Sequence, residues 1–331
     1  MTGPEVAIVT PALADANNGN WQTARRWARM LSRAYRVRLA GAWGGGDEAV
    51  MIALHARRSA ASVAQWRARR GAAPLVVVLT GTDLYRDIAA DASAQASLAS
   101  ADRLVVLNAF GAAALPEHLR PKARVVLQSC SARRTLPKTT RHLRALMVGH
   151  LRAEKAPETF FAAARLLAGR ADILLDHAGA ALDPALGAEA SALMAACPRY
   201  RWLGALAHAA ARRRIQAAHV LVHPSRMEGG AHVVIEAVRS GTPVLASRID
   251  GNVGLLGDDY DGYFAVGDAA GLATLLQRVR DEPAMLAHLQ RQCAARAALF
   301  DPRRESAALH ALIGEILDSR TAPPRPIGDP R

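Results

Sequence analysis

The sequence has few of the residues that build disulfide frameworks, zinc sites and membrane spans. Its 331 residues include 3 cysteines, which lie far apart and form no CxxC pair. This spacing argues against a disulfide framework or a zinc site and is typical of a reducing compartment. No apolar run approaches the ~20 residues that cross a bilayer, and the first residues do not resemble a signal peptide. We therefore expect a cytoplasmic protein without a transmembrane segment.

Lysine and aromatic residues are also scarce, although the chain is strongly basic. Only 3 of the 42 basic residues are lysines, aromatic residues make up 5%, and the formal net charge is +13. Such a charge favours anionic partners: nucleic acid, an acidic membrane surface or small phosphorylated substrates. Nucleic-acid-binding proteins concentrate basic residues in a stripe with aromatic residues between them, whereas these arginines come in scattered pairs and triplets. The pattern favours a solvated, arginine-rich surface, so we expect no specific nucleic-acid partner.

Short apolar segments alternate with helical patterns along most of the chain. The apolar fraction of 51% is sufficient for two domains that each bury a core. Strands are expected at residues 6–10, 35–40, 50–54, 75–79, 104–107, 124–128, 143–148, 173–176, 201–203, 220–223 and 244–247. Helices are expected at residues 21–34, 59–69, 157–167, 231–240, 271–280, 284–299 and 305–318. This alternation predicts parallel sheets covered by helices on both faces.

A basic, proline-containing stretch at residues 131–141 separates two such series. We therefore predict an α/β protein of two Rossmann-like domains, with parallel sheets that face a central cleft. The N-terminal domain is expected to cover residues 1–140 and the C-terminal domain residues 141–302. Residues 303–320 are expected to form a helix that packs back towards the N-terminal domain, and residues 321–331 a disordered tail.

The segment from Val220 to Ser247 is the most informative for chemistry. Its sequence, VLVHPSRMEGGAHVVIEAVRSGTPVLAS, indicates a strand, a polar turn with two glycines, a helix and a second strand. Gly229 and Gly230 let the backbone approach a ligand closely, and amides at the start of a helix suit a phosphate. Glu236, one turn further on, is suited to clasp vicinal hydroxyls, as acidic residues do with ribose in dinucleotide folds. An ordinary strand-to-helix turn with a solvated glutamate is the alternative.

Seven residues separate Glu228 from Glu236, with Pro-Ser before the pair and Gly-x-Pro-Val after it. This pattern resembles the glutamate-x7-glutamate motif of family-four retaining glycosyltransferases. Residues 145–167, 200–206, 215–230 and 247–268 also resemble that family, in the same order. The resemblance implies the B-type glycosyltransferase fold, with the acceptor on the first domain and a nucleotide-sugar on the second. It implies no metal and no cofactor besides this co-substrate.

The same resemblance assigns roles to residues of the second domain. It places Lys155 on the donor diphosphate, Glu236 on the ribose hydroxyls and a catalytic Glu228 beside the transferred sugar. His150, a further donor-site residue, stands where the family usually has arginine. Arg152 either replaces that charge or is an ordinary surface arginine. Amide contacts to the donor are expected from Gly229, Gly230, Ala231 and His232.

Two turns of the first domain are candidates for the acceptor site. An Asn-Gly turn directly before a helix is a possible anion cradle, and a helix start without a ligand is the alternative. The candidate residues of this cradle are Asn18, Gly19, Asn20 and Arg25. In a second turn, Thr82 is a candidate for acceptor binding. Asp83 beside it is either a catalytic residue, as a base or a group that orients a hydroxyl, or a residue that caps the turn.

The opening of the chain and the stretches TGTDLYRD and VGHLR resemble one bacterial branch of the family, the selenosugar synthases. This resemblance implies UDP-N-acetylglucosamine or a related UDP-sugar as donor, selenophosphate as acceptor and a 1-seleno-sugar product, as in selenoneine-type biosynthesis. Selenophosphate is already anionic and selenium is a soft nucleophile, so a general base is less necessary than for an alcohol. Two other hypotheses stay open: ordinary sugar transfer to a hydroxyl, and a non-catalytic anion- or nucleic-acid-binding protein.

Two further patterns resemble metal sites. The sequence DDYD at residues 258–261 contains an aspartate-x-aspartate pair, but in a glycine-flanked loop without the surrounding strand pattern. His219 and His223 are four residues apart on one face of a strand, with no evident third ligand. Neither pattern changes the expectation that the site holds no metal.

Overall fold

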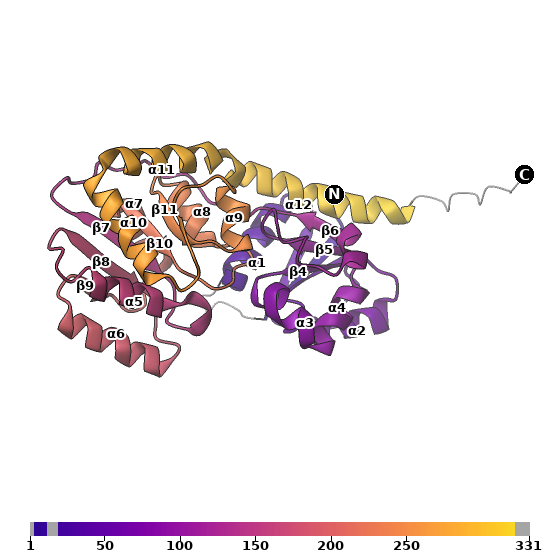
Figure 1. Ribbon diagram of the computed structural model, residues 1–331. Helices are drawn as coiled ribbons and strands as arrows, with labels where there is room; N and C mark the ends of the chain where they lie inside the picture. Colours follow the sequence, from indigo (N-terminus) through magenta and orange to yellow (C-terminus); the bar gives the residue numbers. More distant parts are fainter. Residues whose placement is uncertain (1–2, 12–18, 322–331) are drawn as a thin grey trace, which may run out of the picture. The chain divides into compact units, whose positions relative to one another are not determined.

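The computed structural model describes residues 3–11 and 19–321, and the chain divides into two units. Unit 1 comprises Met1–Val106, Leu115–Val126 and Arg303–Arg331, and unit 2 comprises Leu107–Ala114 and Leu127–Pro302. Each unit has a six-stranded sheet whose strands pair in parallel. Helices flank both sheets (Figure 1). The predicted α/β fold with two parallel sheets is confirmed.

The sheet of unit 1 has the strand order β2-β1-β3-β4-β5-β6. Its strands are β1 (Glu5–Val9), β2 (Arg36–Ala40), β3 (Val50–Leu54), β4 (Leu75–Leu79), β5 (Arg103–Val106) and β6 (Ala123–Val125). The helices of this unit are α1 (Gly19–Leu31), α2 (Ala60–Arg70), α3 (Ile88–Ala90), α4 (Ala92–Ser100) and α12 (Pro302–Thr321). Every residue of β3 and β4 is buried, and their sequences VMIAL and LVVVL contain no polar side chain. Such runs are typical of strands covered on both faces.

Helix α12 is attached to unit 1 by acidic side chains. Glu305 is 2% exposed and accepts hydrogen bonds from Arg26 Nε (2.9 Å) and Trp27 Nε1 (2.7 Å), both on α1. Further along α12, Glu315 accepts a hydrogen bond of 2.8 Å from Arg103 at the start of β5. These contacts hold α12 against helix α1 and strand β5 of unit 1.

The sheet of unit 2 has the order β12-β11-β10-β7-β8-β9. Its strands are β7 (Leu143–Val148), β8 (Ile173–Ala178), β9 (Tyr200–Trp202), β10 (Val220–His223), β11 (Val244–Ser247) and β12 (Tyr263–Phe264). Its helices are α5 (Pro157–Leu166), α6 (Pro184–Ala196), α7 (His208–Ala217), α8 (His232–Val238), α9 (Asp250–Leu256), α10 (Ala269–Asp281) and α11 (Pro283–Arg296). The strand order reverses between β7 and β10. Ligands of such sheets bind beyond the carboxyl ends of the strands at this point, so the ends of β7 and β10 locate the candidate site.

Several element boundaries differ from the expectation. The strand expected at residues 124–128 is Ala123–Val125, and the helix expected at 231–240 is His232–Val238. Beyond that helix, Gly241 has a φ of 69°, a left-handed conformation that ends helices. Helices α4, α6, α7 and α9 were not expected. They are rich in alanine or glycine, which blurs the contrast between apolar and polar faces on which helix prediction depends.

Candidate functional site

An ion pair joins the ends of β7 and β10 in unit 2. Lys155 lies in the 3-10 turn Ala153–Lys155 after β7, and Glu228 lies in the polar turn after β10. The ammonium Nζ of Lys155 donates a hydrogen bond to Glu228 Oε1, and the two side chains are only 18% and 11% exposed. Two predicted donor-site residues, 73 positions apart in the sequence, are thus in direct contact.

His223, the last residue of β10, extends this group of polar side chains. Its Nε2 lies 3.3 Å from Glu228 Oε1, and its Nδ1 lies 3.0 Å from Asn252 Oδ1 on α9. Burial raises the pKa of Glu228, but Lys155 and His223 outweigh burial and bring this pKa well below its usual range. Glu228 is therefore an anion at any ordinary pH, and it is held at the carboxyl end of β10.

A second buried carboxylate, Glu236, lies on the next helix, α8. It is 4% exposed, and its Oε1 lies 2.6 Å from His208 Nε2 on α7, 3.3 Å from His232 Nδ1 and 3.7 Å from Arg212 Nε. Burial by itself raises the pKa of Glu236. Hydrogen bonds from His208 and His232 outweigh burial and bring this pKa down to about 2. The glutamate that the sequence assigns to the ribose is therefore ionised and oriented by three basic side chains.

The same cluster has the composition of a metal site. His208, His232 and Glu236 each offer one ligand atom, and these atoms lie within 4.8 Å of one another. Two histidines and a carboxylate are a common ligand set for zinc. Arg212, however, is 6% exposed, and its guanidinium Nε lies 3.7 Å from the same carboxylate oxygen. Its fixed positive charge opposes a cation at this position, so we do not assign a metal here.

The turn between the two glutamates is closely packed against neighbouring segments. The carbonyl of Gly229 accepts a hydrogen bond of 2.7 Å from Asn108 Nδ2. A Cβ atom on Gly230 would lie 2.7 Å from Leu107 Cβ, so glycine is required at that position. Ala231 is buried, and His232 lies 3.2 Å from the carbonyl of Ser129 through Nε2. Helix α8 has only 7 residues, which makes its dipole a weaker source of attraction for phosphate than the sequence suggested.

His150 and Arg152 follow β7 but do not make equivalent contacts. His150 Nδ1 accepts a hydrogen bond of 3.0 Å from the amide of Ala180. Burial, together with the charges of Arg152 and Lys155, lowers the pKa of His150, so its imidazole is neutral at neutral pH. Arg152 is half-exposed, with the carboxylate of Glu154 at 3.9 Å. Near β7, Lys155 and Arg152 therefore carry positive charge, and His150 does not.

In unit 1, Asp83 is placed as a residue that holds a turn. It is fully buried; its Oδ1 accepts hydrogen bonds from the amides of Thr80 (2.8 Å) and Gly81 (3.0 Å), and its Oδ2 accepts one from the amide of Ala56 (2.9 Å). Both carboxylate oxygens are thus occupied by backbone donors. Of the two readings of Asp83, this geometry fits the turn cap and not the catalytic base.

The other acceptor candidates lie at two places in unit 1. Thr82 is half-buried at the carboxyl end of β4, and its Oγ1 lies 3.1 Å from His55 Nε2. Gly19 is the first residue of α1, with Asn20 and an exposed Arg25 in its first turns. Asn18 lies outside the described residues.

Sequence reasoning missed several residues that the structure brings to these sites. His208 and Arg212 lie on α7, a helix that the periodicity did not indicate, and His55 follows β3 without a surrounding motif. His223 was considered only together with His219 as a metal pair. The two side chains have different partners: His219 contacts the carbonyl of Thr139 at 2.8 Å, whereas His223 lies against Glu228. A basic residue at the end of a buried strand was the available signal for His223.

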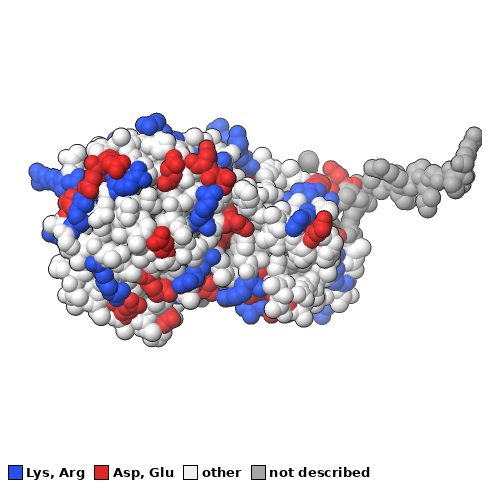
Figure 2. Space-filling model, viewed as in Figure 1, with Lys and Arg blue, Asp and Glu red and all other residues white. Residues whose placement is uncertain are grey.

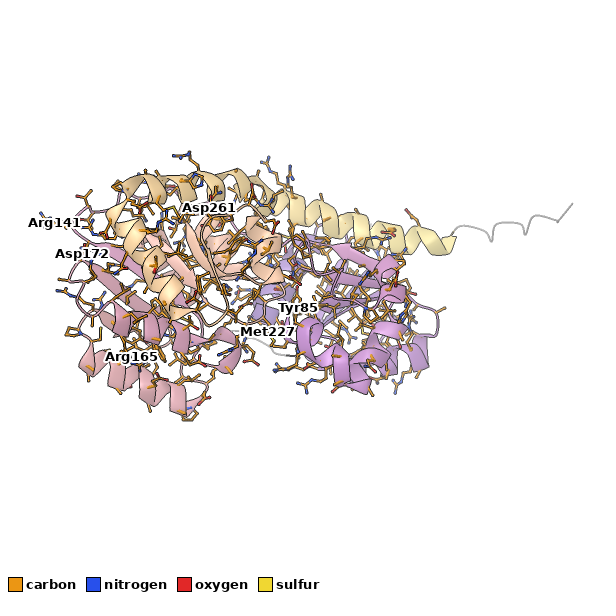
Figure 3. All side chains as sticks on the ribbon, viewed as in Figure 1. Tyr85, Arg141, Arg165, Asp172, Met227 and Asp261 are labelled. Carbon is orange, nitrogen blue, oxygen red and sulfur yellow. The ribbon has the colours of Figure 1, made fainter. Side chains whose placement is uncertain are left out.

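Charged groups on the surface of unit 2 are extensively paired. Arg170 and Arg280 both contact Asp172, at 3.0 and 2.6 Å, and Asp172 is labelled in Figure 3. In the loop of the aspartate-x-aspartate pattern, Asp261 lies 2.6 Å from His288. Figure 2 shows basic side chains interspersed with acidic ones on the visible face, and no continuous basic stripe. None of the described helices is long and apolar enough to cross a membrane.

Comparisons with known proteins found a matching family and similar relatives. Residues 131–318 match the model of a protein family described as glycosyl transferases group 1. A D-inositol 3-phosphate glycosyltransferase of Streptomyces avermitilis is 40% identical over 86 residues, which are 26% of this chain and 18% of the relative. A protein of the same name from Arthrobacter sp. (strain FB24) is 32% identical over 120 residues, which are 33% of this chain and 27% of the relative. The chain thus matches less than a third of either relative's length.

Solved structures resemble the chain over nearly its full length. A sucrose-phosphate synthase from Thermosynechococcus elongatus superposes with a TM-score of 0.76 at 18% identity. The superposition covers 96% of this chain and 100% of the synthase chain. The protein HepE from Anabaena, in complex with UDP and glucose, has a TM-score of 0.73 and 15% identity with the same coverage. At this identity the likeness establishes the fold, which is that of the B-type glycosyltransferases.

Proposed function

Because the chain belongs to the group 1 glycosyl transferases, we propose that it transfers N-acetylglucosamine, or a related sugar, from its UDP conjugate to selenophosphate. The observation that carries the donor half of this proposal is the pair of ionised, buried glutamates on either side of the Gly229-Gly230 turn. Each is held by basic side chains: Glu228 by Lys155 and His223, and Glu236 by histidines and an arginine. Two ionised carboxylates held in fixed orientations offer hydrogen-bond acceptors to a ligand.

In the proposed complex, Glu236 accepts hydrogen bonds from the ribose hydroxyls. A carboxylate can only accept hydrogen bonds, and vicinal hydroxyls are two donors at a matching spacing. Because the pKa of Glu236 is lowered to about 2, the carboxylate keeps its charge throughout the physiological range. The solved HepE complexes, which contain UDP, support uridine as the nucleoside of the donor.

Lys155 is proposed to bind the diphosphate. It contacts Glu228 in the structure, and its ammonium has three donors, so it can keep one bond to Glu228 and offer the others to phosphate oxygens. Such a bridge would hold the diphosphate next to the carboxylate that lies beside the transferred sugar. As the bond between the sugar and the diphosphate breaks, the charge on the departing oxygen grows, and Lys155 is placed to stabilise it.

The proposed transfer balances without an external base. The selenium atom of selenophosphate donates an electron pair to C1 of the sugar, the C1–O bond to the diphosphate breaks, and UDP leaves with that bond's electrons. No proton is removed from the nucleophile. The position of Asp83 supports this acceptor over a hydroxyl, because both oxygens of the only aspartate proposed as a base are bound to backbone amides. The stretch TGTDLYRD that contains Asp83 is also one of the segments that resemble the selenosugar synthases.

The test is to incubate the protein with UDP-N-acetylglucosamine and selenophosphate and to search for a selenium-containing sugar by mass spectrometry. The matched controls are thiophosphate, inorganic phosphate and a panel of alcohol acceptors, with UDP release measured in each reaction. A seleno-sugar formed at the rate of UDP release supports the proposal.

Two other outcomes would replace it. UDP release only with alcohols would identify an ordinary hydroxyl glycosyltransferase. Binding to DNA or RNA that weakens steeply with salt, with no donor turnover, would identify a non-catalytic binding protein.

A further inference from the structure

Among the described residues of unit 1, His55 is the one non-glycine residue with a positive φ. It directly follows β3, and its φ of 72° lies in the left-handed region, which a residue with a side chain rarely adopts. The side chain is 2% exposed, and the backbone amide is tied to the carbonyl of Val78 at 2.8 Å. Strained conformations of this kind persist where the surrounding structure enforces them, and they cluster at binding and catalytic sites.

The strand order of unit 1 places His55 at the expected position for a ligand. The sheet reverses its direction of growth between β1 and β3, and ligands of such sheets bind beyond the carboxyl ends of the strands at that point. His55 follows the carboxyl end of β3, and Thr82 follows that of the neighbouring strand β4. The two side chains meet there, with His55 Nε2 3.1 Å from Thr82 Oγ1.

The hydrogen bonds of His55 determine which ring nitrogen carries the proton. Nδ1 accepts a bond of 3.4 Å from the amide of Arg58, so in the neutral ring the proton is on Nε2. The pKa of His55 is lowered, mainly because the ring is buried. The nearby carboxylates of Asp83 and Asp87 raise this pKa and Arg58 and Arg57 lower it, without reversing the effect of burial. The ring is therefore neutral at neutral pH. Nε2–H donates to Thr82, which leaves the threonine hydroxyl to donate its own proton elsewhere.

A donor that is fixed in this way selects the chemistry of its partner. The Thr82 hydroxyl can therefore donate a hydrogen bond to a ligand that accepts it, as an oxyanion does. His55 cannot act through Thr82 as a base for a protonated acceptor, because the ring nitrogen that faces the threonine already carries a proton. The site therefore suits an acceptor that arrives as an anion.

Of the two arginines whose charges act on the His55 ring, Arg57 has a carboxylate partner and Arg58 has none in the described part of the chain. Arg57 and Arg86 both pair with Asp87, at 2.9 and 3.0 Å. Asp83 is bound to backbone amides, and its Oδ2 lies 3.9 Å from His55 Nδ1. Arg58 is exposed and makes no ion pair with any carboxylate in the described part of the chain.

We propose that the carboxyl ends of β3 and β4 form a subsite for a phosphate-type oxyanion, in which Thr82 donates a hydrogen bond, His55 positions Thr82, and Arg58 supplies the charge. This inference rests on the proposed function, since it assigns the phosphate oxygens of selenophosphate to unit 1. It adds His55 and Arg58 to the proposed acceptor site.

The first experiment measures the binding of inorganic phosphate by phosphorus NMR in the presence of saturating UDP, which occupies the donor phosphate site. Thr82→Val removes the hydroxyl at nearly constant volume and should weaken phosphate binding about tenfold or more, as expected for a hydrogen bond to a charged group. Thr82→Ser keeps the hydroxyl and should bind phosphate within about twofold of the wild type. Arg36→Gln removes one exposed charge of unit 1, distant in sequence from this site, and is the matched control for Arg58→Gln.

His55→Gly distinguishes a positioning role from a purely structural one. Glycine adopts positive φ without strain, so this variant should fold while losing the orientation of Thr82. We expect the KM for selenophosphate to rise about as much as in Thr82→Val, with the Kd for UDP unchanged. His55→Asn, which also tolerates positive φ, provides a second folded variant for the same measurement.

The two proposals fail differently. If the wild type binds phosphate in the presence of UDP and Thr82→Val does not, the subsite stands even if no seleno-sugar is formed. If a seleno-sugar is formed but Thr82→Val has wild-type affinity for phosphate and wild-type KM for selenophosphate, the subsite is refuted and the proposed function stands. Absence of phosphate binding by the wild type with UDP bound also refutes the subsite.

Discussion

Replacing Glu236 by glutamine tests the donor site most directly, because glutamine keeps the shape of the side chain and removes its charge. If Glu236 holds the ribose, hydrogen bonds to a charged acceptor worth about 1.5–3 kcal/mol are weakened, which corresponds to a rise of about 10- to 150-fold in the Kd for UDP. Calorimetric titration of UDP into the wild type and Glu236→Gln measures this change.

The same substitution should also destabilise unit 2. The pKa of Glu236 is lowered from 4.5 to about 2 by His208 and His232, against the effect of burial. A shift of this size favours the carboxylate over its protonated form by about 3 kcal/mol, and glutamine resembles the protonated form. We expect a loss of about 3 kcal/mol in the free energy of unfolding at neutral pH. Glu189→Gln, which breaks an exposed pair with Arg165 at 2.8 Å, is the matched control and should change it by less than about 1 kcal/mol.

A ligand that lacks one hydroxyl separates the ribose contact from general damage to the fold. The wild type should bind 2′-deoxy-UDP more weakly than UDP, whereas Glu236→Gln should discriminate much less between the two. Equal discrimination by both proteins, or an unchanged Kd for UDP in a folded Glu236→Gln, would refute the assignment.

The pH dependence follows from the direction of the shift. A carboxylate with a lowered pKa stabilises the fold above its unfolded pKa, and this contribution is lost as the pH falls through the folded value. For Glu236 the loss is expected between about pH 4.5 and about pH 2. UDP affinity should therefore not fall through protonation of this residue between about pH 7 and about pH 5.

Four further substitutions test other parts of the structure. Lys155→Met should weaken the binding of UDP more than that of uridine in a calorimetric titration, because only UDP carries the diphosphate. Equal effects on the two ligands would show that Lys155 does not bind the diphosphate. Gly230→Ala should lower the free energy of unfolding by about 1–3 kcal/mol in a denaturant titration, because its Cβ would lie 2.7 Å from Leu107 Cβ. Asp83→Asn should lower the free energy of unfolding by about 1–3 kcal/mol, since the backbone amides bound to Asp83 lose a charged acceptor. A fully stable but inactive variant would instead support Asp83 as a catalytic base. Glu305→Gln should lower the free energy of unfolding by about 3 kcal/mol, because it removes a buried carboxylate that joins α12 to α1. A thermal unfolding midpoint equal to that of the wild type would contradict this contact.

The alternation of apolar strands and helical patterns made the fold predictable from the sequence. β3 and β4 are continuous apolar runs, which are typical of buried parallel strands, because a strand covered on both faces has no solvated side. Helix α7 illustrates the limit of this reasoning. Its residues HAAARRRIQA have a weak apolar face, and burial of Ala211 and Ile215 against unit 2 decides its conformation.

The sequence alone was also enough to predict the two glutamates of the proposed donor site, because Glu228 and Glu236 lie in one continuous segment with a recognisable spacing. Only the tertiary structure decided which side chains hold them. Lys155 reaches Glu228 from β7, and His208 reaches Glu236 from α7, because parallel strands bring the ends of distant segments to one edge of a sheet. Likewise, the sequence allowed either a base or a turn cap at Asp83. The choice between them depended on the backbone amides that donate hydrogen bonds to its carboxylate. Local pattern specifies elements, whereas the ionisation and orientation of a buried side chain depend on partners that sequence spacing does not encode.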